Sequence, residues 1–532
     1  MYNNTNSDIN ECTSRGVCSI PPNISALQEL LLFFIKQTAF YIVELKKLGV
    51  NNSEIKEKII SDLASIVSIS EFNEKQLYQL VYDNFCMLKN AKLKYISRTK
   101  ETNTESVELE IPFELEDHTS LPKAISQGEK IFFINYKKYN QNQRNLFEIL
   151  NVVLKSVCLN IKKIQEYEKN QNINIYKVIE ALYIYNENDV SVNEIQQEIE
   201  KLSVLNSQLL LDLSYKLTSR FGDMSYVKVS HSTTKGKAIL VSGNNFFDLI
   251  NVLESVKNTE IDVYTHSGLL ICHSLKKFQE YKNLKGHYGN STESCILDFA
   301  TFPGAILLTK NSKNGTEYLY RGKIFSNDYV VPQGVIKIEN NDFTDLIESA
   351  KYLKGFKKGK KKESSFVGYN ENELETKLKY IISKIKSGVI KKLYLIGTNS
   401  YSEIQKEYFY KFFSDLKYNE FAIDFSYNKQ QKNVLSLNIG DYVPLAIRLL
   451  NKLLSEKDII NNMYFFFTKC DSLTISEIIW LKSLGVNNIY MSKCSPVLLN
   501  PAVLDCFLFK YNVKITNNAI LDLKEIRTFR KK

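Results

Sequence analysis

Cysteine thiols are the side chains in this sequence best suited to holding a metal. The sequence contains nine cysteines, and only Cys12 and Cys18 lie close together, separated by five residues and just before a predicted helix. A helix N-terminus stabilises a thiolate, which suits metal or cluster binding. A cubane iron–sulfur cluster normally has four thiolate ligands, however. Two cysteines in one chain are too few, so their spacing alone favours thiols without a ligand role.

Histidine is the second candidate ligand, and the sequence has five. His266 and His273 follow a predicted strand, with Cys272 adjacent and Cys295 further on. Folds with parallel strands place their sites at the carboxyl ends of those strands. Metal binding is therefore one interpretation, but the spacing matches no familiar zinc pattern. We favour imidazoles with structural hydrogen bonds.

The composition is typical of a large globular protein, and the cysteine content indicates a reducing compartment. The 532 residues are enough for about three domains, and 44% are hydrophobic and 24% charged. The net charge of +10 is a weak bias toward acidic partners. The apolar stretch from Leu30 to Val43 is interrupted by Lys36 and Gln37, and no secretory signal is evident. We therefore expect a cytoplasmic protein with reduced cysteines and no membrane span.

The first 225 residues have the apolar period of helices. Ser25 is the predicted N-cap of the first helix, Gln28 completes a capping box, and Gly49 ends the helix. Further helices are predicted at Glu74–Leu93, Asn145–Tyr167 and Val192–Phe221. Residues 105–135 are less regular and predict a loop or short strands.

Strand–helix–strand patterns begin after residue 225 and predict parallel sheets. The division into domains is 1–225, helical; 226–362, α/β; and 363–532, α/β. The fold class is thus a helical bundle followed by two Rossmann-like α/β domains. Strands that end in Gly243 and Gly397 lack the spaced glycines of a dinucleotide site and the lysine of a phosphate loop, so no nucleotide site is supported.

A basic stretch, Lys357–Lys362, ends the first α/β domain. It has no apolar period, which favours a solvated linker over a nucleic-acid contact. We expect no nucleic-acid partner from the sequence.

Several segments resemble hybrid-cluster proteins, the prismane or hydroxylamine reductase family. The matching segments, in chain order, are Cys12–Cys18, Gly236–Gly243, Asp262–His266, Gly286–Asn290, Phe299–Leu307, Leu484–Ile489 and Leu498–Pro501. The resemblance covers nearly the whole chain. It implies helical bundles followed by two Rossmann-like domains. It also implies an iron–sulfur–oxygen cluster between domains, held by one histidine, two glutamates and four cysteines, and reduction of hydroxylamine or nitric oxide.

Most of these implied ligands are replaced in this sequence. The histidine position is Asn244, the first glutamate position is Gly268, and the second is Asp471, which keeps a carboxylate. The four cysteine positions are Ser312, Asn399, Tyr427 and Gly440. Cys12 and Cys18 resemble the last two of four cubane cysteines and are interpreted as a remnant of that motif. Amides, hydroxyls and glycine replace thiolates poorly as iron ligands.

The sequence therefore predicts a degenerate family member without the hybrid cluster and with no other cofactor. Its role would be binding, regulatory or structural, with an unidentified protein or small-molecule partner, and a homodimer is one arrangement that we consider. One alternative is an iron–sulfur oxidoreductase with an altered metal site, in which Asp471 remains a ligand. Another is a cluster shared by Cys12 and Cys18 of two chains.

Overall fold

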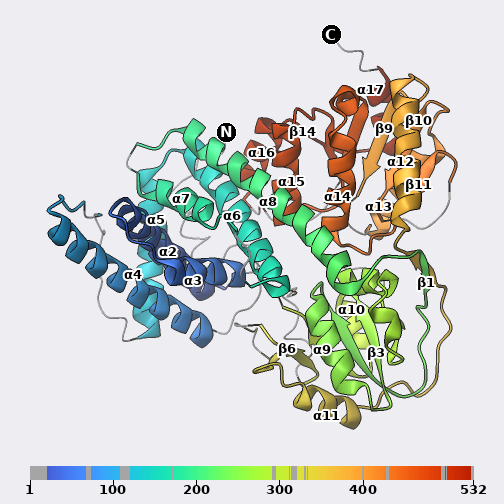
Figure 1. Ribbon diagram of the computed structural model, residues 1–532, viewed down its shortest axis with the longest axis horizontal. Helices are drawn as coiled ribbons and strands as arrows, with labels where there is room; N and C mark the ends of the chain where they lie inside the picture. Colours follow the sequence, from blue (N-terminus) through green and yellow to red (C-terminus); the bar gives the residue numbers. More distant parts are fainter. Residues whose placement is uncertain are drawn as a thin grey trace.

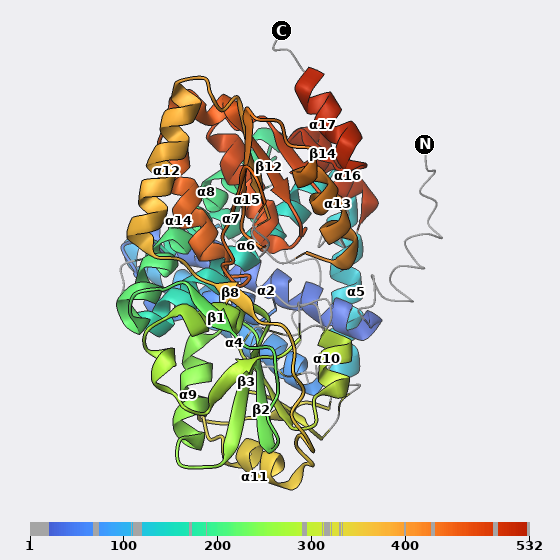
Figure 2. The same cartoon turned by 90° about the vertical axis from the view of Figure 1, so that its right-hand side faces the viewer.

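The computed structural model shows a helical region and two α/β regions (Figures 1 and 2). The structure describes residues 21–66, 74–107, 109, 120–169, 173–187, 189–289, 295–310, 312, 320, 322–328, 331, 334–397, 401–426, 431–492, 498 and 500–528. In Figure 2 the two α/β regions lie one above the other, with the helical region behind them. The predicted fold class is confirmed.

Seven helices of the described chain form the helical region. They are α2 (Pro22–Lys47), α3 (Ser53–Ser65), α4 (Glu74–Thr102), α5 (Leu121–Lys138), α6 (Gln141–Tyr167), α7 (Tyr176–Tyr183) and α8 (Val192–Phe221). By length and composition α2 could cross a membrane, but 78% of its most apolar 18-residue window is buried inside the protein. It packs against α4, α5 and α7, so its apolar side chains form the core of this region.

Among the described helices α8 is the longest; it runs diagonally across the centre of Figure 1 and packs between the helical region and the second α/β region. It contacts α6 on one side and α14 and α15 on the other. The buried amide of Asn206 donates to the hydroxyls of Ser156 on α6 (3.1 Å) and Ser476 on α15 (3.0 Å). This contact places α6 beside α15.

The first α/β region contains a six-stranded parallel sheet in the order β4-β3-β2-β5-β6-β7. Its strands are β2 (Lys237–Ser242), β3 (Ile261–His266), β4 (Leu284–His287), β5 (Ala305–Leu308), β6 (Ile324–Ser326) and β7 (Ile336–Lys337), and its helices are α9 (Phe246–Val256), α10 (Cys295–Thr301) and α11 (Thr344–Tyr352). Alternate side chains of β2 enter different cores: Ile239 packs in the main core and Leu240 in a smaller one on the other face. Helices therefore cover both faces.

The second α/β region repeats this topology, with the strand order β11-β10-β9-β12-β13-β14. Its strands are β9 (Lys392–Ile396), β10 (Glu420–Asp424), β11 (Val434–Ser436), β12 (Met463–Phe467), β13 (Ile489–Met491) and β14 (Val513–Ile515), and its helices are α12 (Glu371–Lys386), α13 (Glu403–Ser414), α14 (Val443–Leu454), α15 (Ser472–Ser483), α16 (Pro501–Lys510) and α17 (Ala519–Thr528). In both sheets the order reverses between the first and fourth strands. Such a switch point is where open α/β sheets place ligands.

A narrow ribbon connects the two α/β regions. The short strands β1 (Val227–Val229) and β8 (Ser365–Val367) pair antiparallel. The basic stretch that precedes β8 is exposed, but its backbone is paired with residues 232–236. The linker is thus held against the first α/β region.

Candidate functional site

Three of the predicted ligand positions meet at the switch point of the first sheet. Asn244 lies just after β2, Gly268 just after β3, and Ser312 shortly after β5. A Cβ atom built on Gly268 would lie 3.1 Å from the Cβ of Asn244, and one built on Gly243 would lie 2.1 Å from the Oγ of Ser312. Because parallel strands end at the same edge of a sheet, these residues from distant segments are neighbours.

Hydrogen bonds tie this edge together. The hydroxyl of Thr309 accepts from the backbone N–H of Asn244 at 3.2 Å and lies 2.9 Å from the Ser312 hydroxyl. Gly243 has a φ of 135° and is crowded by Thr309 and Ser312, so a side chain there would clash. The Oδ1 atom of Asn244 is buried without a hydrogen-bond partner in the described part of the protein. This edge of the sheet therefore presents hydroxyl and amide groups, and the Asn244 Oδ1 atom is an acceptor without a donor among the described residues.

The second α/β region contributes two of the predicted positions. Gly440 follows β11, and a Cβ there would lie 2.6 Å from the backbone nitrogen of Ile271, a residue shortly after Gly268. Asp471 follows β12 and is the N-cap of α15, where its Oδ1 accepts from the N–H of Thr474 at 2.9 Å. The carboxylate therefore already has a structural role. Asn399, Tyr427, Cys12 and Cys18 lie outside the described residues.

Charged groups that the sequence did not single out complete the site. Lys310 lies after β5, and its Nζ is 3.6 Å from Oε1 of Glu166 on α6 and 3.9 Å from Oδ1 of Asp248 on α9. The amide of Asn245, which caps α9, donates to Oε2 of Glu166 at 2.6 Å. Burial raises the pKa of both carboxyl groups. This network of Glu166, Asp248, Asn245 and Lys310 joins the helical region to the first sheet.

Two further ionisable groups, Lys163 and Glu477, lie on α6 and α15. Burial lowers the pKa of Lys163 on α6 to about 8, and Asp471 is one of the carboxylates that act on it. Glu477 on α15 is 2% exposed, and neither of its carboxyl oxygens has a hydrogen-bond partner among the described residues. Burial and, second, Asp471 raise the pKa of Glu477 well above its ordinary value. Glu477 is therefore held as the neutral acid.

The histidines form a hydrogen-bonded group at the same edge of the first sheet. The Thr265 hydroxyl lies 2.9 Å from ring nitrogens of both His273 and His287. His266 bonds to the hydroxyl of Ser242 at 2.8 Å and lies 3.3 Å from the Asp298 carboxylate. Burial lowers the pKa of His273 to about 4 and that of His287 well below 6.5. His273 and His287 are therefore neutral imidazoles that form hydrogen bonds within the protein.

The donor set does not fit the ligand set of the hybrid cluster. Iron–sulfur clusters take thiolate ligands, and Asn244, Gly268, Ser312 and Gly440 supply none. Burial raises the pKa of the Cys272 thiol well above its ordinary value, which disfavours a thiolate. No group of three or more His, Cys, Asp or Glu side chains in the described chain is arranged to hold a metal ion.

Comparison with known proteins gives one consistent family. The model of the Prismane/CO dehydrogenase family matches residues 6–423. The chain is 26% identical to a hydroxylamine reductase of Thermodesulfovibrio yellowstonii over 97% of this chain and 98% of that protein. It is 25% identical to a hydroxylamine reductase of Zymomonas mobilis over 97% and 96% of the two chains.

A solved structure is also similar. It shows the alpha subunits of acetyl-CoA synthase/carbon monoxide dehydrogenase with NiZn[Fe4S4] and NiNi[Fe4S4] clusters. The match has a TM-score of 0.49 and 10% sequence identity and covers 97% of this chain and 83% of that one.

Proposed function

Since this chain belongs to the Prismane/CO dehydrogenase family, we propose that it is a degenerate member that keeps the fold and holds no hybrid cluster. Its role is binding, regulatory or structural rather than reduction of hydroxylamine, and it acts in the cytoplasm. The observation that carries this proposal is the meeting of Asn244, Gly268 and Ser312 at one sheet edge. These positions are neighbours in space, yet they offer an amide, no side chain and a hydroxyl.

Coordination chemistry is the physical reason. Soft thiolates select iron–sulfur clusters, whereas neutral amides and hydroxyls bind iron weakly. Even the loss of one outer partner of a metal ligand costs about 10–100-fold in metal affinity, and here several direct ligands are replaced. The Thr309–Ser312 hydroxyl pair and the Glu166–Lys310 ion pair already use polar groups around this edge. These hydrogen bonds and ion pairs within the chain support the proposal, because they give the polar groups of this edge partners other than a cluster.

The test is a metal analysis of the full-length protein purified without oxygen. Iron, acid-labile sulfide and the visible spectrum are measured on protein whose fold is checked by circular dichroism. We expect folded, colourless protein with far less than one iron per chain. We also expect no hydroxylamine reduction with a chemically reduced viologen as electron donor. Stoichiometric iron together with turnover would establish the alternative, an oxidoreductase with an altered metal site.

A matched variant separates the two readings further. Asp471→Asn removes the carboxylate that a metal would need but keeps the helix cap, because asparagine and aspartate cap about equally well. Under our proposal the variant and the wild-type protein have the same low iron content and the same circular dichroism spectrum. A loss of iron in the variant alone would show that Asp471 is a ligand.

A further inference from the structure

The basic stretch before β8 pairs with residues 232–236, and together these two segments extend the β1–β8 ribbon. Thr233 and Lys360 exchange backbone hydrogen bonds of 3.0 and 3.1 Å, and Gly236 and Phe356 exchange bonds of 3.1 and 2.8 Å. The N–H of Lys362 also donates to the Ser232 hydroxyl at 3.0 Å. The lysines of this stretch are therefore held in place along the first α/β region.

These lysines are exposed and mostly without acidic partners. All six are exposed: Lys354, Lys357, Lys358, Lys360, Lys361 and Lys362. Lys362 lies 5.5 Å from the centre of the Tyr288 ring; the other five form no ion pair with a described residue. Like charges fixed on one strand repel one another, and an anionic partner relieves that repulsion.

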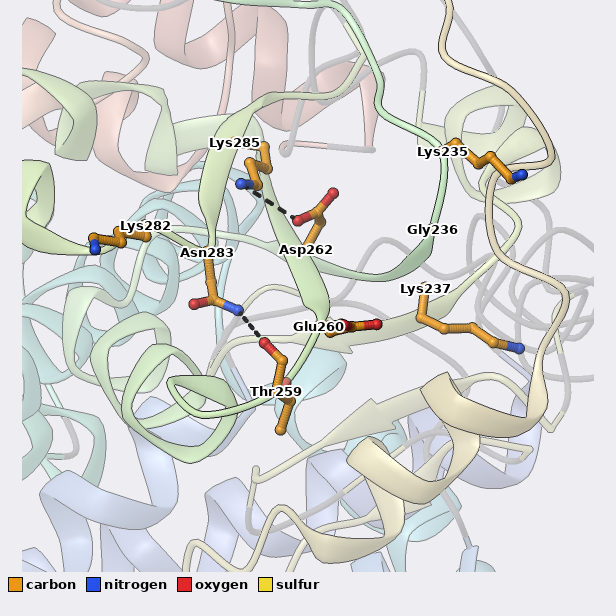
Figure 3. A pocket seen from close by; sticks show the side chains of 9 residues that line it. All are labelled: Lys235, Gly236, Lys237, Thr259, Glu260, Asp262, Lys282, Asn283 and Lys285. Carbon is orange, nitrogen blue, oxygen red and sulfur yellow. Dashed lines mark hydrogen bonds and ion pairs between the residues drawn. The ribbon is translucent and has the colours of Figure 1, made fainter.

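A pocket beside the ribbon extends the positive surface. It has a volume of about 400 Å³ and lies at the amino ends of β2, β3 and β4, the opposite edge of the sheet from the site described above. In Figure 3, Lys282 and Lys285 lie on one side and Lys235 and Lys237 on the other, around Glu260 and Asp262.

The acidic groups in this pocket offset little of the charge. Asp262 is paired with Lys285 at 3.7 Å and accepts a hydrogen bond from the Thr234 hydroxyl. That leaves Glu260 in the pocket and Glu363 on the ribbon against the remaining lysines. We call the six ribbon lysines and the four pocket lysines the basic track.

Exposed aromatic rings lie at both ends of the ribbon. Tyr352 is 91% exposed and ends α11 beside Leu353, whose carbonyl accepts from the ammonium of Lys237 at 2.5 Å. At the other end Tyr226 and Phe366 stack with ring centres 5.0 Å apart and are 59% and 38% exposed. Because these rings are exposed to solvent, a planar group of a partner can stack on them without disrupting packing inside the protein.

Phosphates and unstacked bases together match this combination. Proteins bind single strands with a basic groove that follows the phosphates and with aromatic rings on which bases stack. A duplex keeps its bases paired and stacked inside, so it would use the lysines but not the rings. At roughly 3.3 Å per residue the stretch from Lys354 to Phe366 reaches at most about 40 Å, enough for several nucleotides. We propose that the basic track binds single-stranded nucleic acid, in contrast to the expectation from the sequence.

The experiment uses the full-length protein and fluorescein-labelled oligonucleotides of twenty thymidines or twenty uridines. Binding is followed by fluorescence anisotropy at several salt concentrations. For about five phosphate contacts, the slope for single strands predicts an affinity about 100-fold weaker at 200 mM than at 50 mM salt. Comparing the two oligonucleotides shows whether DNA or RNA is preferred.

Two variants separate the charge from the rings. Replacing Lys357, Lys358, Lys360 and Lys361 by glutamine should weaken binding at least tenfold at 50 mM salt and reduce the salt slope by about 3. Tyr352→Ala should weaken binding about tenfold, and Tyr352→Phe should restore it, because a base stacks on either ring. The matched control neutralises four exposed lysines of the helical region, Lys100, Lys123, Lys130 and Lys137, and should leave the affinity within about twofold.

Three results would overturn the proposal. One is no anisotropy change at 50 mM salt. Another is equal binding by the ribbon variant and the helical-region control. The third is equal or tighter binding of a twenty-base-pair duplex or of vesicles containing phosphatidylserine, which would mark the track as a site for duplexes or acidic membranes. Circular dichroism of each variant confirms that the fold is retained, since the replaced side chains are exposed.

Discussion

Replacing Glu477 by glutamine should remove a pH dependence from the stability of the protein. Glu477 is buried on α15 with both carboxyl oxygens unpaired among the described residues, and burial raises its pKa well above the ordinary value. The folded state therefore keeps a proton that the unfolded chain releases above about pH 4.3. In this window the folded state binds more protons, so the free energy of unfolding falls as the pH rises.

The size of the effect follows from the linkage relation. Each pH unit between the unfolded pKa and the folded pKa lowers the free energy of unfolding by about 1.4 kcal/mol. Between pH 5 and pH 7 the loss due to Glu477 is therefore at most about 3 kcal/mol. Glutamine has nearly the same shape and no charge, so the variant lacks this slope. Its stability relative to the wild-type protein should rise steadily with pH.

The sequence provides its own probe for this measurement. Trp480 is the only tryptophan, is buried, and lies on α15 close to Glu477. Urea unfolding followed by tryptophan fluorescence from pH 5 to pH 8 therefore reports on the same helix. Glu525→Gln, an exposed change on α17 that removes the Glu525–Lys514 ion pair, is the control for the loss of a carboxyl group at the surface. A constant difference between wild type and Glu477→Gln at all pH values would refute the reasoning.

Three further predictions concern the site and the N-terminus. The pKa of His273 lies at about 4 because of burial, so stability is lost as the pH falls from about 6.5 to 4, by up to about 3 kcal/mol. The measurement is an NMR titration of the ring signals of isotope-labelled histidines, and five signals that all titrate near pH 6.5 would contradict the prediction. Asn245→Ala removes the cap of α9 and the bond to Glu166, and should lower stability by about 1–2 kcal/mol, measured by urea unfolding. If Cys12 and Cys18 of two chains share a cluster, Cys12→Ser abolishes iron binding and the dimer together; an iron-free dimer that persists in the variant, as measured by light scattering, removes that hypothesis.

Local signals predicted many elements well where capping and period agree. The period predicted a helix at Val192–Phe221, and α8 has these bounds, with a capping box between Ser191 and Glu194 at its start and Gly222 after its end. The start of α2 was predicted wrongly: the helix begins at Pro22, and Ser25 lies inside its first turn. Proline at the first helical position is itself a start signal, and it outweighs the serine here.

Helix α5 shows what tertiary packing hides from the sequence. Residues 105–135 predicted a loop or short strands, but α5 spans Leu121–Lys138. Gly128 lowers the helix propensity of this segment. A Cβ at Gly128 would lie 2.0 Å from the carbonyl oxygen of Ala26, so the glycine permits the close approach of α5 to α2.

The candidate site was predictable only in part. The strand-end positions Asn244, Gly268 and Ser312 followed from the resemblance, and the structure places them together. Glu166 and Lys310 come from different regions of the chain, and no local period predicts their contact. Glu477 did leave a signal, since it is the only acidic residue of α15 and directly precedes the apolar run Ile478–Leu481.

The pairing of β1 with β8 has a consequence for how this protein can be rearranged. Val227 lies opposite Val367, so the chain enters and leaves the first α/β region at neighbouring positions. A short turn could therefore connect the residues that precede β1 to those that follow β8. The first α/β region is thus an insertion between the helical region and the second α/β region, with its first and last strands paired to each other.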